Sequence, residues 1–239
     1  LVEPFSAYPV SSDLSDSSSW RVLASTLGAY AARDKIAPTR REAADENGKI
    51  LFSALDAGVY LAVGDSCVSD ASFYTFTPFL VSLPARNAQG QTIAVLSASP
   101  KYECTPASSP VSLTAVKTWS DGSSEQRPAS VEIQLLRDDE IWDTVVLNEA
   151  NQWRHTWSEL ESGYLWQVTE KTVPAGYTVS IERRDGTFLL CNTLPGTDSP
   201  APPSLPQTGA LWWPVAAFIV SGLLFLLIGC LLKKKNHAN

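Results

Sequence analysis

The sequence predicts an all-β chain of two β-sandwich domains, the first carrying one helix, followed by a proline-rich linker and a C-terminal transmembrane helix. Segments between residues 110 and 194 alternate apolar and polar side chains, and turn residues at 174–176 and 185–186 separate them. An uncharged apolar run lies close to the C-terminus. Alternation with a period of two is typical of half-buried strands, and short strands spaced in this way favour a sandwich.

Composition limits the classes of protein to consider. The 239 residues have room for two modest domains, and 44% hydrophobic and 18% charged residues indicate a globular chain. A net charge of -7 argues against general nucleic-acid binding, so no nucleic acid is expected as a partner. The sequence contains no Met and opens at Leu1 without a basic and then apolar stretch. We therefore expect a fragment whose own start, including any signal peptide, is absent.

Residues 210–232 have the properties of a membrane-spanning helix. They carry no charge and would extend about 34 Å at ~1.5 Å per residue, enough for a hydrocarbon core of about 30 Å. The lysines at 233–235 should stay cytoplasmic, so residues 233–239 form a cytoplasmic tail and the rest lies outside. A buried core helix is disfavoured by the length of the run. A lipid-anchor signal is disfavoured because its apolar tail would not end in lysines.

A five-residue motif stands directly before this span: Leu205, Pro206, Gln207, Thr208 and Gly209. Motif, apolar span and basic end resemble, in this order, the LPxTG sorting signal of Gram-positive surface proteins. The resemblance implies that a sortase cuts between Thr208 and Gly209 and joins Thr208 to a peptidoglycan cross-bridge or to a neighbouring pilin subunit. The protein would then be exposed at the cell wall, and residues 210–232 would span the membrane only transiently, before the sortase cuts. A near copy at 194–198 ends in Asp198 and has no adjacent span, so we do not interpret it as a signal.

Residues 195–204 are rich in Pro, Ser and Thr and predict a wall linker. Such a segment cannot build a core, and it extends about 3.1 Å per residue where it adopts polyproline II.

Residues 108–194 resemble a Cna B-type domain, an immunoglobulin- or prealbumin-like sandwich. The stretches that carry the resemblance are 116–119, 127–131, 147–148, 168–170 and 173–177. Many members of this family contain an intramolecular Lys–Asn isopeptide bond whose formation an acidic residue assists. By position, the resemblance implies Lys117, Asn192 and Glu170 for these three roles.

Strand periodicity supports this assignment, because each of the three residues extends an otherwise apolar strand face. The faces are Leu113, Ala115, Lys117 and Trp119; Tyr164, Trp166, Val168 and Glu170; and Phe188, Leu190 and Asn192. Lysine and glutamate are rarely buried without a partner. The alternative is that all three side chains lie at strand ends and point into water.

The expected chemistry requires burial. Desolvation lowers the pKa of a lysine and raises that of a carboxyl group, so a neutral Lys117 amine and a protonated Glu170 can coexist. Glu170 would then polarise the Asn192 carboxamide and assist proton transfer while ammonia leaves. The reaction consumes its own nucleophile, so it is a maturation step and not catalytic turnover.

We expect residues 1–107 to form a truncated N-terminal pilin-like β domain, because residues 76–84 and 99–103 resemble the N-terminal modules of Gram-positive pilins and related surface proteins. Residues 15–36 have serines at their start and apolar residues at helical spacing, which predicts one helix. Strands are expected in 48–54, 58–65, 72–84 and 91–98. An internal repeat relates residues 52–65 to residues 157–170, which predicts that this domain is a diverged relative of the second, so that two Cna B-type domains stand in tandem. It lacks the strand that would supply a bonding lysine, so no isopeptide bond is expected there.

No motif for turnover catalysis is present, so no enzymatic activity, cofactor or metal is expected. Cys67 and Cys104 both follow predicted strands of the first domain, and whether they pair is left open. Cys191 lies beside Asn192 on the opposite strand face, and Cys230 lies in the predicted span.

Three classes of function remain. The first is a structural or adhesive surface protein, either a pilin-like subunit or an adhesin displayed singly. The second is a module that binds a host ligand, with the extracellular matrix or the host cell surface as partner, and the third is the anchor region of a surface enzyme whose catalytic domain is missing. Lys101 follows Pro100 near the expected domain junction, where shaft pilins carry a pilus-linking lysine in a Tyr-Pro-Lys setting; Ser99 replaces the tyrosine here. The alternative for Lys101 is an ordinary solvated lysine.

Overall fold

The computed structural model of the chain describes residues 3–11, 16–86, 89–93, 95–122 and 125–196. The predicted sorting motif, span and tail lie outside the described residues, as does most of the predicted linker. Within the described part, the chain contains no helix of the length and apolarity that a membrane crossing needs. Residues 1–198 belong to one compact unit.

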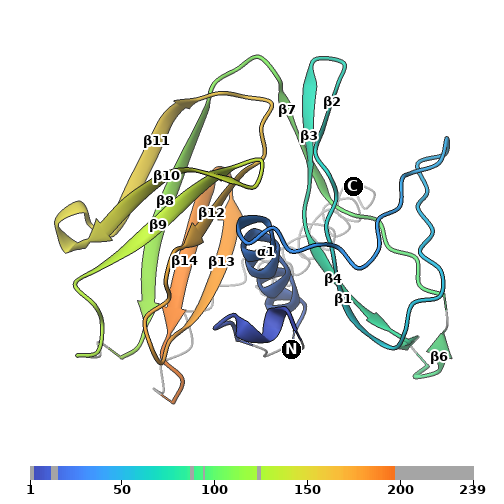
Figure 1. Cartoon of the computed structure of the whole chain (residues 1–239), viewed down its shortest axis with the longest axis horizontal. Helices are drawn as coiled ribbons and strands as arrows, with labels where there is room; N and C mark the ends of the chain where they lie inside the picture. Colours follow the sequence, from blue (N-terminus) through green and yellow to red (C-terminus); the bar gives the residue numbers. More distant parts are fainter. Residues whose placement is uncertain (1–2, 12–15, 87–88, 94, 123–124, 197–239) are drawn as a thin grey trace, which may run out of the picture. The chain divides into compact units, whose positions relative to one another are not determined.

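The described chain is mostly β-strand with one α-helix, which confirms the predicted fold class. Its largest part is a sandwich of two sheets with strand orders β11-β8-β14-β13 and β10-β9-β12 (Figure 1). The strands are β8 (Val111–Ser120), β9 (Ser130–Arg137), β10 (Glu140–Asn148), β11 (Arg154–Leu160), β12 (Trp166–Glu170), β13 (Thr178–Arg184) and β14 (Thr187–Thr193), with the short 3-10 helix η2 (Glu149–Asn151) after β10. The first and last of these strands, β8 and β14, are parallel neighbours, whereas the other strand pairs of the sandwich are antiparallel.

Alternating side chains of both sheets fill the core between them, as the periodicity predicts. Ala115, Ile133, Leu135, Leu147, Val168 and Leu190 are fully buried there.

The register of β14 is fixed by a tight turn. Arg184 pairs with Thr187, so Asp185 and Gly186 alone form the loop between β13 and β14. Both residues have a positive φ, 45° and 75°, as a two-residue hairpin turn of the primed type requires. This turn determines which residues of β14 face the core.

Helix α1 (Ser17–Arg33) lies within residues 15–36, where the sequence predicts a helix. Asp16 caps it, because its carboxylate accepts hydrogen bonds from the backbone N–H groups of Ser18 (2.6 Å) and Ser19 (2.9 Å). The helix packs mainly against β13 of the sandwich, and it also contacts β4, β12 and β1 (Figure 1). Ala29 and Tyr30 thereby join the same buried apolar cluster as the sandwich core. The amphipathic pattern alone did not predict this packing partner.

Residues 34–107 form small sheets. β1 (Gly58–Ala62) pairs with β4 (Phe79–Leu83); β3 (Ser72–Phe76) lies between β2 (Cys67–Ser69) and β7 (Tyr102–Pro106); and β5 (Ala85–Arg86) pairs with β6 (Thr92–Ile93). The N-terminal segment also contains the 3-10 helix η1 (Phe5–Ala7).

The strand predicted at 48–54 is wrong. Residues 34–57 contain no strand, and the side chains of Ile50, Leu51 and Phe52 are exposed. Gly48 has a positive φ of 70°, and the Asp45 carboxylate accepts hydrogen bonds from the backbone N–H groups of Asn47 (2.9 Å) and Lys49 (2.8 Å), so a turn occupies the start of the predicted strand. The division at residue 107 and the tandem relation of the two domains stay predictions.

Candidate functional site

Lys117 lies on β8 with its side chain completely buried. Its ammonium Nζ donates hydrogen bonds to the carbonyl oxygens of Thr118 (3.2 Å) and Leu190 (3.4 Å). Nζ also lies 4.3 Å from the centroid of the Trp119 ring. The amine is therefore held among carbonyl groups and an aromatic face and is kept away from water.

Asn192 reaches the same place from β14. In the parallel pairing, Leu190 is opposite Lys117 and Asn192 is opposite Trp119, so Asn192 lies two residues further along the shared face. Its side chain is fully buried, and Nδ2 donates a hydrogen bond of 3.0 Å to Oε1 of Glu170. The lysine and the asparagine thus come from neighbouring strands, and their side chains enter the same buried space.

Glu170 closes the group from the opposite sheet, at the end of β12. It is fully buried, and its Oε2 lies 3.5 Å from Nζ of Lys117. The structure therefore brings together the three residues that the resemblance implied. The alternative with all three in water does not hold, since none of the three side chains reaches the surface.

Burial sets the protonation of this group. Desolvation lowers the pKa of Lys117 to about 8, although the nearby Glu170 opposes the shift. Desolvation also raises the pKa of Glu170, against the opposing effects of Lys117 and of the Asn192 hydrogen bond. Both shifts favour uncharged forms, so a neutral amine can face a protonated carboxyl group. Attack of a lysine amine on a side-chain carboxamide, with proton transfer by a carboxyl group, requires this protonation state.

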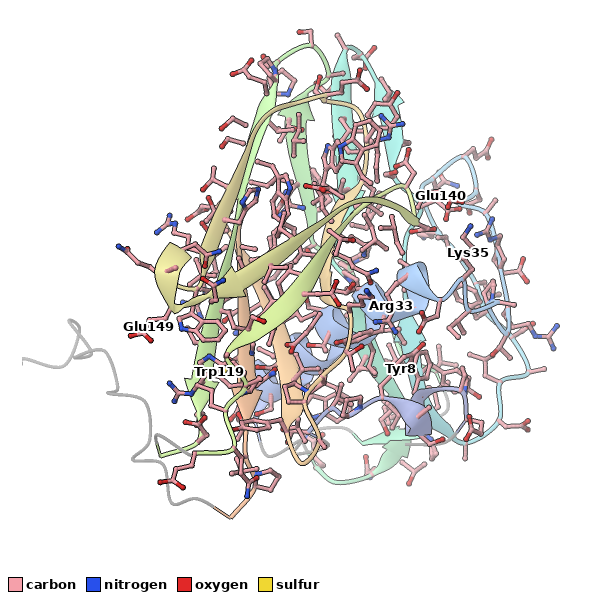
Figure 2. The ribbon with its side chains drawn as sticks, turned by 60° about the vertical axis from the view of Figure 1, so that its left-hand side comes forward. Tyr8, Arg33, Lys35, Trp119, Glu140 and Glu149 are labelled. Carbon is pink, nitrogen blue, oxygen red and sulfur yellow. The ribbon has the colours of Figure 1, made fainter. Side chains whose placement is uncertain are left out.

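Aromatic and polar side chains surround Trp119, which Figure 2 labels and which lies beside the Lys117 amine. The Trp119 ring makes edge contacts with Trp153 (5.3 Å between centroids) and Tyr177 (5.4 Å). Beside them, buried Asp121 accepts two hydrogen bonds from Arg127 (3.0 and 2.5 Å) and one from the Tyr177 hydroxyl (3.0 Å). The sequence reasoning missed Asp121; its one signal was the position directly after strand β8.

Lys101 lies apart from this buried group in the sequence and in exposure. Its side chain is exposed directly before β7, and its backbone carbonyl accepts a hydrogen bond from the N–H of Thr77 (2.8 Å). The Lys101 amine is therefore accessible from solution, unlike the buried amine of Lys117.

Cys67 and Cys104 do not pair. Both are free and exposed, and both are opposite Tyr74 of the intervening strand β3. Two strand spacings of about 4.8 Å separate them, whereas the Cα atoms of a disulfide lie at most about 6.8 Å apart. Across the described ranges, no group of three or more potential metal-ligating residues occurs.

Comparison with known proteins identifies the sandwich. The family model described as the Cna protein B-type domain matches residues 113–193. This segment is a Cna B-type domain. The family model ends there and does not extend into residues 1–112.

Each of the individual relatives covers only part of this chain. The collagen adhesin of Staphylococcus aureus is 32% identical in an alignment over 90 residues that covers 34% of this chain and 8% of that protein. A single B repeat unit of the collagen binding surface protein of Staphylococcus aureus is 22% identical, with a TM-score of 0.34, and the match covers 49% of this chain and 74% of that one. The full-length major pilin RrgB of Streptococcus pneumoniae is 20% identical, with a TM-score of 0.30, over 34% of this chain and 15% of that one. The chain thus spans less than a tenth of the length of the curated adhesin.

Proposed function

We propose that the chain is a structural or adhesive surface protein of a Gram-positive cell, pilin-like in type, whose Cna B-type domain forms an isopeptide bond between Lys117 and Asn192. One observation carries the proposal: a lysine, a glutamate and an asparagine from three strands are buried together, with Nζ to Oε2 at 3.5 Å and Nδ2 to Oε1 at 3.0 Å. Burying a lysine and a glutamate without a covalent bond between the strands has a desolvation cost, so the unreacted group contributes little to stability.

In the proposed reaction, Nζ of neutral Lys117 attacks Cγ of Asn192 and forms a new C–N bond. The bond from Cγ to Nδ2 breaks, and Glu170 shuttles a proton from the lysine nitrogen to the leaving group, which departs as ammonia. One ammonia is lost for each bond formed, and no oxidant or external reagent is needed. Each chain reacts once.

The position of the proposed bond suggests its use. It joins the first strand of the domain to the last, which lie side by side in parallel, so it closes a loop of about 75 residues. Tension applied along the chain would then pass through a covalent bond, and the hydrogen bonds between strands would not carry it. A protein that links a cell surface to something outside it would benefit from this path.

Attachment to the wall completes the proposal. A sortase would join Thr208 to peptidoglycan or to a neighbouring pilin subunit, residues 195–204 would hold the folded part away from the wall, and residues 210–232 would retain the precursor in the membrane. The order of motif, apolar span and lysines supports this step. A module that binds host matrix or host cells, and the anchor region of a surface enzyme, remain the alternatives.

Cell fractionation tests the attachment. Muramidase digestion of the wall should release the protein in a form that detergent alone does not extract. Thr208→Ala should move the protein into the detergent-soluble membrane fraction, whereas Thr197→Ala, in the near copy of the motif, should leave it in the wall. Equal detergent extraction of the unaltered protein and of both variants would mean an ordinary membrane-anchored protein.

A shaft subunit of a pilus is the second candidate, and the exposure of Lys101 favours it. Its amine could attack the acyl-enzyme formed at Thr208 of the next chain. With the cognate sortase, a denaturing gel of the wall extract should show a ladder of high-mass species that Lys101→Ala abolishes and Lys49→Ala, at another exposed lysine, does not. A single band for the unaltered chain and for both variants would contradict the shaft role and favour an adhesin displayed singly.

A further inference from the structure

Both sheets of the Cna B-type domain have an edge strand on the same side. β13 ends one sheet and β12 ends the other, and α1 packs against both (Figure 1). An edge strand leaves a row of backbone N–H and C=O groups without partners in its sheet. Here the segment before and within α1 supplies partners: the N–H of Val179 donates to the carbonyl of Pro9 (2.7 Å), and that of Ile181 donates to Oγ1 of Thr26 (2.8 Å).

The contact with β12 lies directly behind the proposed reaction site. The Tyr30 ring is buried, and its hydroxyl donates a hydrogen bond of 3.2 Å to the backbone carbonyl of Glu170. Nη1 of Arg33 donates to the same carbonyl (3.2 Å) and to that of Lys171 (3.4 Å). The residue that carries the carboxyl group is therefore held by two side chains of α1.

Further contacts hold Tyr30 in place. The Tyr8 ring stacks on it with 5.1 Å between centroids, and the Arg33 guanidinium lies 4.5 Å from the centroid of the Tyr30 ring. Tyr8 in turn donates a hydrogen bond of 2.6 Å to Asp34. Figure 2 labels Tyr8 and Arg33 beside the helix. All of these residues precede the segment that matches the family, so they belong to this chain and not to the domain as the family model defines it.

We infer that α1 completes the bond-forming site, with Tyr30 as a positioning residue that fixes the end of β12 and excludes water from Glu170. The inference rests on the isopeptide bond proposed above. It makes bond formation conditional: Lys117 and Asn192 join only after the N-terminal segment has docked. The cross-link then locks a domain whose neighbouring segment is already in place.

Docking of α1 influences the pKa values of Lys117 and Glu170. The charged and titratable groups around Glu170 and Tyr30 are Lys117, Cys191 and Asp121 from the sandwich, Arg33 from α1, and Tyr8 and Asp34 from the segments on either side of α1. Burial raises the pKa of Tyr30, with Glu170 adding to the shift, so its hydroxyl stays a neutral donor. Water admitted at this position would return the pKa of Lys117 toward its usual higher value and that of Glu170 toward its usual lower value. The reactive neutral forms of both groups would become scarcer.

The test follows the rate of bond formation in the full chain. The chain is synthesised cell-free in a mild detergent, samples are quenched in acidic denaturant at timed intervals, and intact mass gives the fraction that has lost ammonia. Tyr30→Ala should slow the reaction about tenfold or more, as expected if one protonation equilibrium shifts by one pKa unit. Tyr102→Ala, which removes an exposed tyrosine of β7, should leave the rate unchanged.

A pH series separates positioning from loss of folded protein. The bell-shaped rate profile of Tyr30→Ala should become lower and broader, because hydration raises the pKa of Lys117 and lowers that of Glu170, whereas partial unfolding would reduce the yield without changing the shape of the profile. Tyr30→Phe keeps the ring and should react faster than Tyr30→Ala. Thr26→Val weakens docking at β13 without touching Glu170 and should also slow the reaction, which keeps the inference testable if Tyr30→Ala fails to fold.

The outcomes distinguish the inference from the proposed function. An unaltered chain that keeps all of its ammonia overturns the isopeptide bond, and this inference with it. An unaltered chain that loses ammonia while Tyr30→Ala and Thr26→Val react at the same rate overturns the role of α1 alone.

Discussion

Lys117→Met should lower the free energy of unfolding by about 4–5 kcal/mol, the entropic contribution expected for a cross-link that closes a loop of about 75 residues. Methionine retains the apolar stem and removes the amine, so the buried space stays filled while the bond cannot form. The melting temperature should fall by roughly 10–20 °C, because 1 kcal/mol corresponds to about 2–4 °C for a unit of 150–250 residues. Thermal unfolding followed by circular dichroism measures both quantities.

Lys171→Met is the matched control for this prediction. Lys171 directly follows Glu170 but has a half-exposed side chain, paired with Glu132 at 3.0 Å. An exposed ion pair contributes at most about 1 kcal/mol, so this variant should melt within a few degrees of the unaltered chain. A similar small change in both variants would contradict a covalent role for Lys117.

Glu170→Gln should prevent the bond from forming. The amide has nearly the shape of the carboxyl group, but it cannot pass a proton from the lysine to the departing ammonia. General acid–base assistance contributes about 10²–10⁴-fold to such reactions, so the variant should keep its full sequence mass for hours after folding. Intact-mass measurement shows the difference directly.

The control here is Glu132→Gln, at a half-exposed glutamate of β9 that should not affect the reaction. Complete loss of ammonia in Glu170→Gln would show that the carboxyl group is not needed. The Glu170 carboxyl group would then only pack and hydrogen-bond within the buried group, without a role in the reaction.

The alternation of apolar and polar residues predicted which strand face each site residue lies on. It did not predict that the three side chains come together. Lys117, Glu170 and Asn192 each continue an apolar strand face, which is a local property and can be counted in the sequence. That β8 lies parallel to β14, with Asn192 two residues beyond Lys117, is a long-range pairing that no local pattern encodes. The family resemblance supplied this step, and the residues alone did not.

Two other features could not be predicted, because they also depend on contacts between segments that are far apart in the sequence. The spacing of Leu23, Leu27 and Tyr30 predicted an apolar helix face, but a helix face does not state which surface it covers, so the contact with Glu170 was missed. Cys67 and Cys104 both follow predicted strands, and only the strand order shows that β3 separates them.

The most direct test of the proposed chemistry is the mass of the unaltered full chain together with a map of its protease fragments. We expect an intact mass one ammonia below that of the sequence and a branched peptide in which Nζ of Lys117 is joined to Cγ of Asn192. A full sequence mass, with Lys117 and Asn192 recovered in separate unmodified peptides, would contradict the account.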